Sequence, residues 1–132
     1  MTQVQSLSLN VYMPSNEYLV HLVPLKQLRE LSLTSHDLNE VGIAHLASLP
    51  NLSVLSIRTD TATAQHLKRL KKLEVIHLYG EYLGSLGVRH LVEVKGLKKV
   101  VAHGIDVDSE TEDLLRKAHP GLELERVPTG TF

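Results

Sequence analysis

The sequence predicts an α/β fold, a right-handed β-α solenoid of about five repeats with a parallel concave sheet and convex helices. Two observations predict it. An apolar pattern restarts every 21 to 25 residues along almost the whole chain. Within each repeat, alternating apolar residues give way to apolar residues three and four apart, a change from the period of a strand to that of a helix. Each repeat is therefore expected to form strand, turn, helix and turn, and to bury its apolar face against its neighbours.

The strand part of each repeat carries aliphatic residues at its first, fourth and sixth positions. Repeats start near residues 4, 28, 52, 73 and 97, and a shortened sixth starts at Leu122. The copies of the motif are Val4-x-x-Leu7-x-Leu9, Leu28-x-x-Leu31-x-Leu33, Leu52-x-x-Leu55-x-Ile57, Leu73-x-x-Ile76-x-Leu78 and Leu97-x-x-Val100-x-Ala102. This recurrence indicates that one structural unit is repeated along the chain.

The helix part is clearest in the copies 28–51 and 73–96, which match at every apolar position, Val41 over Leu86 included. The third repeat has only 21 residues because its strand-to-helix connection lacks three, and connections are the least constrained part of such a unit. The helix leucines expected to face inward, against the strands, are Leu46, Leu49, Leu67 and Leu70.

Length and composition predict a single domain, 1–132, that ends in a C-terminal cap over 108–127 and a tail over 128–132. The chain is 42% hydrophobic with one Phe and no Trp, so the core must be aliphatic. Cysteine is absent, which excludes disulfides, thiolate metal sites and cysteine nucleophiles together.

The charges and the hydropathy bear on partners and location. Lys plus Arg number 14 and Asp plus Glu number 15, a balance that gives no overall field for nucleic acid or for an anionic membrane. The chain does not open on a basic segment followed by an apolar run, and it has no long apolar stretch. We therefore expect a cytoplasmic protein that binds neither nucleic acid nor membrane.

The two ends of the predicted solenoid differ. At the C-terminal end, Ser109-x-x-Glu112 predicts a capping box that starts the last helix, and 122–127 predicts a short, charged edge strand. At the N-terminal end, the strand Val4 to Leu9 starts with no capping helix before it. Three interpretations of this edge stay open: another segment or chain covers it, copies of the chain associate through it, or its Gln and Ser side chains make it polar enough.

A longer motif joins strand to helix in Leu28 to Leu49 and in Leu73 to Val94. It reads L-x-x-L-x-L followed by x-x-G-[IV]-x-H-L-x-x-L, with aliphatic substitutes. Through this motif the chain resembles leucine-rich repeats of the ribonuclease-inhibitor-like and bacterial type, over about residues 4 to 127. The resemblance implies a solenoid whose function lies on the concave sheet.

By alternation, three rows of side chains are expected on that concave sheet. The rows are Ser6, Glu30, Val54, Val75 and Lys99; Ser8, Ser32, Ser56, His77 and Val101; and Asn10, Thr34, Arg58, Tyr79 and His103. Tyr and Arg are enriched at interface hot spots, so the later repeats carry the predicted site for a protein partner. Its residues are Arg58, His77, Tyr79, Lys99 and His103. The alternative is that they are ordinary members of a strand surface.

Four histidines recur at the same position of successive repeats and predict a column along the helical side: His21, His45, His66 and His90. Metal sites need three or four ligands at one point, whereas a column spreads them one per repeat. We therefore expect no metal here, and interpret these rings as partly buried donors to neighbouring backbone.

The motifs of hydrolases, zinc proteases and phosphate-binding loops are absent from the sequence, and no catalytic residue or cofactor is predicted. Asp106-x-Asp108-x-Glu110 resembles a calcium loop but has Thr111 where the loop needs glycine, so it predicts the turn and cap of the last helix. The expected function is a non-enzymatic protein-protein interaction module. The alternatives are a structural element that self-assembles through the N-terminal edge, or part of a larger repeat array.

Overall fold

Strands and helices alternate along the chain in the computed structural model, which describes residues 3–9, 16–80 and 83–128. The strands are β1 (Ser6–Ser8), β2 (Glu30–Asp37), β3 (Val54–Arg58), β4 (Val75–Tyr79), β5 (Lys99–His103) and β6 (Glu123–Val127). The α-helices are α1 (Glu40–Leu46), α2 (Thr61–Ala64), α3 (Ser85–Arg89) and α4 (Ser109–Ala118). The 3-10 helices are η1 (Asn16–Leu22), η2 (Gln65–Arg69) and η3 (His90–Glu93).

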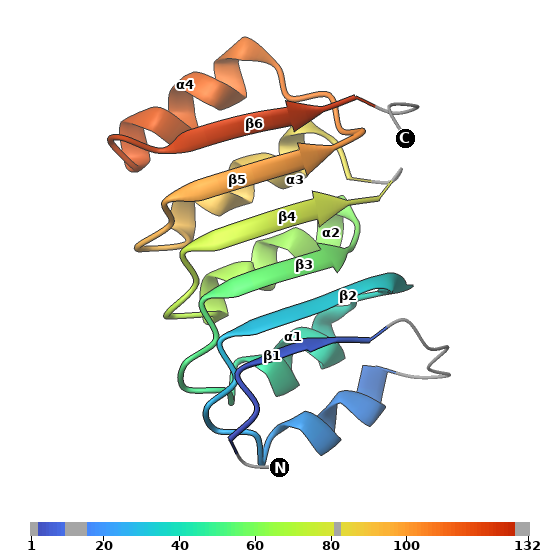
Figure 1. The fold of residues 1–132 in the computed structure, drawn as a ribbon. Coiled ribbons are helices and arrows are strands. Elements are labelled where there is room, and N and C mark those ends of the chain that lie inside the picture. The colour runs from blue at the N-terminus through green and yellow to red at the C-terminus, as the bar shows by residue number, and fades with distance from the viewer. Residues whose placement is uncertain (1–2, 10–15, 81–82, 129–132) are drawn as a thin grey trace.

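The described strands form a single open sheet of six parallel strands, ordered β1-β2-β3-β4-β5-β6. Because neighbours in the chain are also neighbours in the sheet, every connection is a crossover, and each crossover carries a helix. All the helices lie on one face of the sheet (Figure 1). The predicted α/β class with a parallel sheet is therefore confirmed, and its layered arrangement is compatible with a solenoid.

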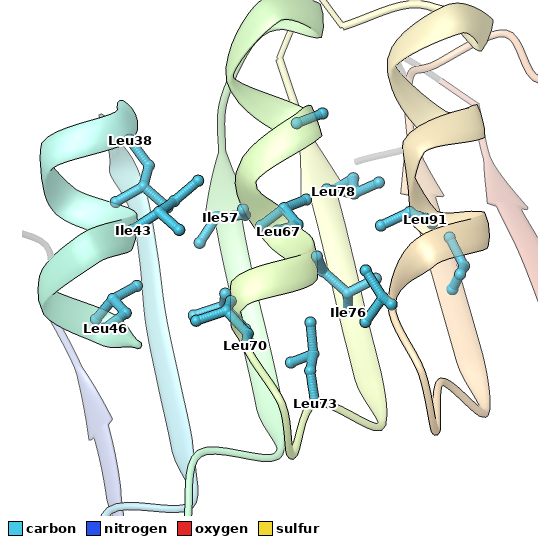
Figure 2. Packing of buried hydrophobic residues seen from close by; sticks show 14 of the residues in the cluster. Leu38, Ile43, Leu46, Ile57, Leu67, Leu70, Leu73, Ile76, Leu78 and Leu91 are labelled. Carbon is cyan, nitrogen blue, oxygen red and sulfur yellow. The ribbon is translucent and has the colours of Figure 1, made fainter. Parts of the chain in front are cut away.

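The core lies between the sheet and the helices (Figure 2). Strand residues such as Leu55 and Ile76 are fully buried there, and the helix leucines predicted to face inward are buried as well. Val41 and Leu86 behave differently, because their side chains are 42% and 65% exposed. Each follows the helix start by one residue and points outward, so the matching apolar positions do not all belong to the core.

Short polar side chains cap the starts of α1, α2 and α4, whereas α3 starts after Gly84. Asn39 accepts hydrogen bonds from the backbone N–H groups of Val41 and Gly42, and Asp60 accepts one from Thr63 at 2.8 Å. At α4 the cap is Asp108, which accepts from the N–H of Thr111 at 2.8 Å.

The predicted Ser109 capping box is therefore wrong by one residue. Ser109 is the first residue of α4, one position inside the helix, because Asp108 before it already fills the cap position. The Glu112 carboxylate accepts hydrogen bonds from the side chains of Arg116 and Arg126 instead of capping the helix start. The prediction that Asp106, Asp108 and Glu110 form the turn and cap of this helix is confirmed for Asp108.

The short third repeat changes the sheet where its connection is shortened. Six positions separate Leu33 from the cap Asn39, whereas three separate Ile57 from the cap Asp60, which confirms the predicted deletion. The pairing of β2 with β3 shifts register between Leu33 and Asp37 to absorb the difference. Buried Thr59 links the connections after β3 and β2, because its hydroxyl donates a hydrogen bond to the carbonyl of Leu38 at 2.8 Å.

The glycine of the helix motif is required by close packing between repeats. A Cβ on Gly87 would overlap Leu83 and press on the backbone of Thr61 in the preceding repeat. A Cβ on Gly42 would overlap the side chain of Asn16. That buried amide accepts a hydrogen bond from the Asn39 N–H at 2.9 Å, so it ties η1 to the start of α1.

The N-terminal end of the sheet is less enclosed than its middle. The predicted strand appears as β1, and its Leu7 and Leu9 are only partly buried, whereas Leu31 in β2 is fully buried. η1 lies beside α1 and contributes the buried Leu19. Among the described residues, β1 pairs on one side only, with β2.

At the C-terminal end of the sheet, an ion pair between charged side chains joins α4 to β6. Glu112 on α4 accepts hydrogen bonds from Arg116 at 2.9 Å and from Arg126 of β6 at 2.6 Å. Arg126 also donates to the carbonyl of Val107 at 3.1 Å, before the helix. The last helix and the last strand are therefore joined on their solvent side as well as through the core.

Leu67→Ala is expected to lower the free energy of unfolding by about 2 to 5 kcal/mol, because it opens a cavity at a fully buried position between η2 and the sheet. The matched control is Leu86→Ala, which removes the same atoms from an exposed position and is expected to change stability by less than about 0.5 kcal/mol. Urea unfolding followed by circular dichroism measures both. Equal losses would contradict the assignment of the core.

Glu112→Gln is expected to destabilise the chain at pH 7 but not at low pH. The hydrogen bonds from Arg126 and Arg116 hold the pKa of Glu112 below its ordinary value of 4.5. The stabilisation is therefore complete above pH 4.5 and is lost as the pH falls through the lowered pKa of the folded state. Urea unfolding from pH 7 to pH 3 measures the difference from wild type, with Asp113→Asn on the same helix as the control. A difference that is constant over this range would show that no charge is involved.

Candidate functional site

The face of the sheet opposite the helices, here called the open face, carries the polar members of each strand. The register confirms the first two predicted rows across the described strands, from Ser6 to Lys99 and from Ser8 to Val101. In the third row Arg58 lies opposite Tyr79, as predicted. Every described strand therefore contributes equivalent positions to the open face.

Two positions of the third row, those of Asn10 and Thr34, are not confirmed by the register. Asn10 lies outside the described residues. Thr34 was expected beside Arg58, but the structure pairs Asp37 with Arg58. The cause is the register shift near the end of β2, because the longer second repeat must return to the path of the shorter third one.

Three rings are in contact on β4 and β5, here called the stacked cluster: His77, Tyr79 and His103. Tyr79 and His103 stack face to face, and His77 meets the edge of His103. The Tyr79 and His103 rings have centroids 4.0 Å apart and planes within 9° of parallel. The His77 and His103 rings have centroids 5.5 Å apart at 26°. Nδ1 of His77 lies 3.2 Å from Nε2 of His103, a hydrogen bond in which the tautomers decide which nitrogen donates.

Burial and neighbouring charge favour the uncharged form of both histidines. Burial is the main cause that lowers the pKa of His77 below its ordinary value of 6.5, and the charge of Lys99 lowers it further. Burial also lowers the pKa of His103, and a charge on His77 would lower it again. Glu125 opposes both effects. At neutral pH the pair is therefore an uncharged donor and acceptor.

Lys99 and two glutamates border the stacked cluster on the side of β6. The Lys99 Nζ lies 3.8 Å from Glu125 and 3.9 Å from Glu123, so its charge is partly balanced. Glu123 and Glu125 were not among the predicted site residues. They continue the first two rows, opposite Lys99 and Val101, so extending the alternation to β6 would have found them.

Val101 was predicted to lie on the surface of the concave sheet, but its side chain is covered. It belongs to the open face but is only 2% exposed. Its neighbours in the register are His77 on one side and Glu125 on the other, and both are longer side chains. Val101 therefore forms a covered apolar base beside the stacked cluster and offers no surface to a partner.

The five predicted residues come together to different degrees. His77, Tyr79 and His103 are in contact, and Lys99 is close enough to His77 to shift its pKa. Arg58 is exposed at the end of β3, one strand away from Tyr79. The site thus joins stacked rings, two cationic side chains and two carboxylates, and it presents donors and acceptors around an aromatic centre.

The histidine column lies along the helices, one ring per repeat, as its spacing predicted. His45, His66 and His90 are partly buried and His21 is exposed. The Nε2 of His66 lies 3.6 Å from a carboxylate oxygen of Glu40, one repeat away. In the part of the chain that the structure describes, no three His, Asp or Glu side chains are grouped so that they could hold a metal ion.

A histidine that bonds to backbone does occur, at a position outside this column. His119 is buried, and its Nε2 lies 2.9 Å from the carbonyl of Leu91. This contact joins the end of α4 to the preceding repeat. No sequence signal marked it, because the equivalent positions of the earlier repeats hold aliphatic residues, Leu49, Leu70 and Val94, instead of histidine.

No protein-family model matches the chain, and a comparison with curated proteins finds no match either. Within residues 3–9, 16–80 and 83–128, the helices are all too short or too polar to cross a membrane.

Proposed function

We propose that this chain is a leucine-rich repeat module of the right-handed solenoid type, and that it binds a protein partner on the open face without catalysing a reaction. The observation that carries the proposal is the stacked cluster of His77, Tyr79 and His103, with centroids 4.0 and 5.5 Å apart. The repeat period and the strand order of the sheet support the repeat type.

A stack of rings is well suited to binding because its geometry exists before the partner arrives. Aromatic and arginine side chains dominate interface hot spots, where they bury a large area. Ordering flexible side chains on binding normally costs about 0.5 to 1.5 kcal/mol for each one. The contacts within the stacked cluster order these side chains before the partner binds, so less ordering is needed on binding. Tyr79 is therefore expected to be the main anchor.

The surroundings of the cluster define the rest of the surface. Lys99 of β5 with Glu123 and Glu125 of β6 forms a polar margin. Val54 and Val75 are half-buried on β3 and β4 and supply apolar area beside it. A stable interface buries roughly 800 Å² on each partner, so the partner must extend along several strands beyond the rings.

A second candidate is favoured by the N-terminal edge. Leu7 and Leu9 are only partly buried there, whereas the equivalent residues of β2 to β5 are fully buried. A further strand added beside β1 would cover them. Copies of this chain, or more repeats of a larger array, would supply such a strand.

The test is affinity capture from a lysate of the source cell with the variant Arg58→Glu/Tyr79→Ala. A hot-spot loss of about 2 kcal/mol weakens binding roughly 30-fold, so the partner should disappear from the captured proteins. The control is Arg69→Glu/Tyr18→Ala, which changes the same residue types at exposed positions on the helical side. Circular dichroism verifies that both variants are folded.

Mass spectrometry then identifies what each chain retains. A protein held by the wild type and the control but not by the open-face variant supports the proposal. If both variants retain the same proteins, the open face is not the binding surface. If further copies of the chain alone are retained, the N-terminal edge is favoured.

A further inference from the structure

We propose that acid releases the partner from the open face, because the His77 and His103 rings hold the stacked cluster together only while at least one of them is uncharged. This inference rests on the proposed function and adds its regulation. It starts from the hydrogen bond between the two rings, 3.2 Å from Nδ1 of His77 to Nε2 of His103.

The hydrogen bond limits the charge that the pair can carry. A nitrogen that accepts must have a free lone pair, so the bond needs one uncharged ring. With one added proton, an imidazolium donates to an imidazole and the bond persists. With two added protons, both facing nitrogens carry hydrogen and the two positive charges repel at close range. The second protonation is therefore the step that separates the rings.

The charged groups around the two histidines determine the pH at which the second protonation occurs. On the strands packed beside them these groups are Arg58 of β3, Tyr79 of β4, Lys99 of β5, and Glu123 and Glu125 of β6. Lys99 disfavours protonation of His77, while Glu125 favours protonation of both rings. Lys99 lies 3.8 Å from Glu125, so this carboxylate is shared between the lysine and the histidines, while Glu123 lies 3.9 Å from the lysine. The carboxylates therefore do not fully offset the cost of burying a second positive charge.

Loss of the pair changes the shape of the binding surface. Tyr79 stacks on the face of His103, and His77 holds the edge of the His103 ring through the hydrogen bond. A single charge on His103 leaves the tyrosine contact intact, because a cation above an aromatic ring is favourable. Repulsion from a second charge breaks the hydrogen bond and moves His103 away from His77, so the ring that stacks on Tyr79 is no longer held in place. Above about pH 6.5 the stack is complete, and it is lost as the pH falls through the second titration.

The first experiment follows the free, full chain by NMR, recording the ring signals of His77 and His103 from pH 8 to pH 4.5. We expect two coupled titrations below the ordinary histidine range. The upfield shift that the Tyr79 ring gives the His103 protons should vanish in the second of them. Independent titration of the two rings, or an upfield shift that persists throughout, overturns the inference without touching the proposed function.

The second experiment uses the protein captured at pH 7.5, identified by mass spectrometry and purified. Its affinity for the wild type is expected to fall about tenfold for each pH unit below the second titration, the slope of one linked proton. The test variant is His77→Gln, which retains an amide donor for His103 but cannot be charged. Because His77 belongs to the proposed binding surface, the affinity of this variant at pH 5 is compared only with its own affinity at pH 7.5, and the two should be equal, provided that circular dichroism shows it folded. The control is His21→Gln at an exposed position on the helical side, which should bind at pH 7.5 and lose affinity at pH 5 as the wild type does.

The outcomes separate the two proposals. Equal wild-type affinity at pH 7.5 and pH 5 overturns the acid release and leaves the open face as the binding site. An equal acid loss in wild type and His77→Gln places the effect in the partner, and also overturns the inference. If no captured protein depends on Tyr79 at pH 7.5, the proposed function fails, and the inference fails with it.

Discussion

Each repeat of this chain can bury its apolar residues only against the next repeat, and the rest of the structure depends on that constraint. A strand and one short helix cannot enclose a core alone. Parallel pairing places successive strands about 4.8 Å apart, and the leucines of one unit then fill the space beside those of the next. Leu55, Ile76 and Val100 occupy equivalent registered positions and are all fully buried.

The same constraint creates the open face. When one side of every strand is committed to the core, the residues between the leucines must face the other way. Register then aligns them in rows across the sheet, so side chains far apart in the sequence become neighbours. His77 and His103 are 26 residues apart and share a hydrogen bond for this reason. The chemistry of the site is thus a consequence of how the core is packed.

The sequence alone predicts the parts of the structure that follow from period. Strands, inward leucines and two rows of the open face could all be read from spacing, because a repeated unit must pack in a repeated way. The features that depart from the regular repeat were harder to predict. The pairing of Asp37 with Arg58 depends on how a connection of different length returns to the sheet. The cap at Asp108 reflects competition between neighbouring residues that are both good caps.

The contacts of the stacked cluster also lay beyond prediction from spacing. Alternation placed His77, Tyr79 and His103 on one face, but side-chain rotation decides whether rings stack or diverge. The burial of Val101 was missed for the same reason, since it depends on how its longer neighbours lie. Spacing identifies the face on which a residue lies, and side-chain packing decides what that residue does there.

The register of β4 and β5 brings the rings of Tyr79 and His103 into contact. The most direct measurement is a nuclear Overhauser spectrum at pH 7.5 of a chain labelled in tyrosine and histidine. With centroids 4.0 Å apart, cross-peaks are expected between the protons of these two rings, absent in His103→Ala. If both rings are assigned in a folded chain and no cross-peak joins them, the stacked cluster does not exist and the account is contradicted.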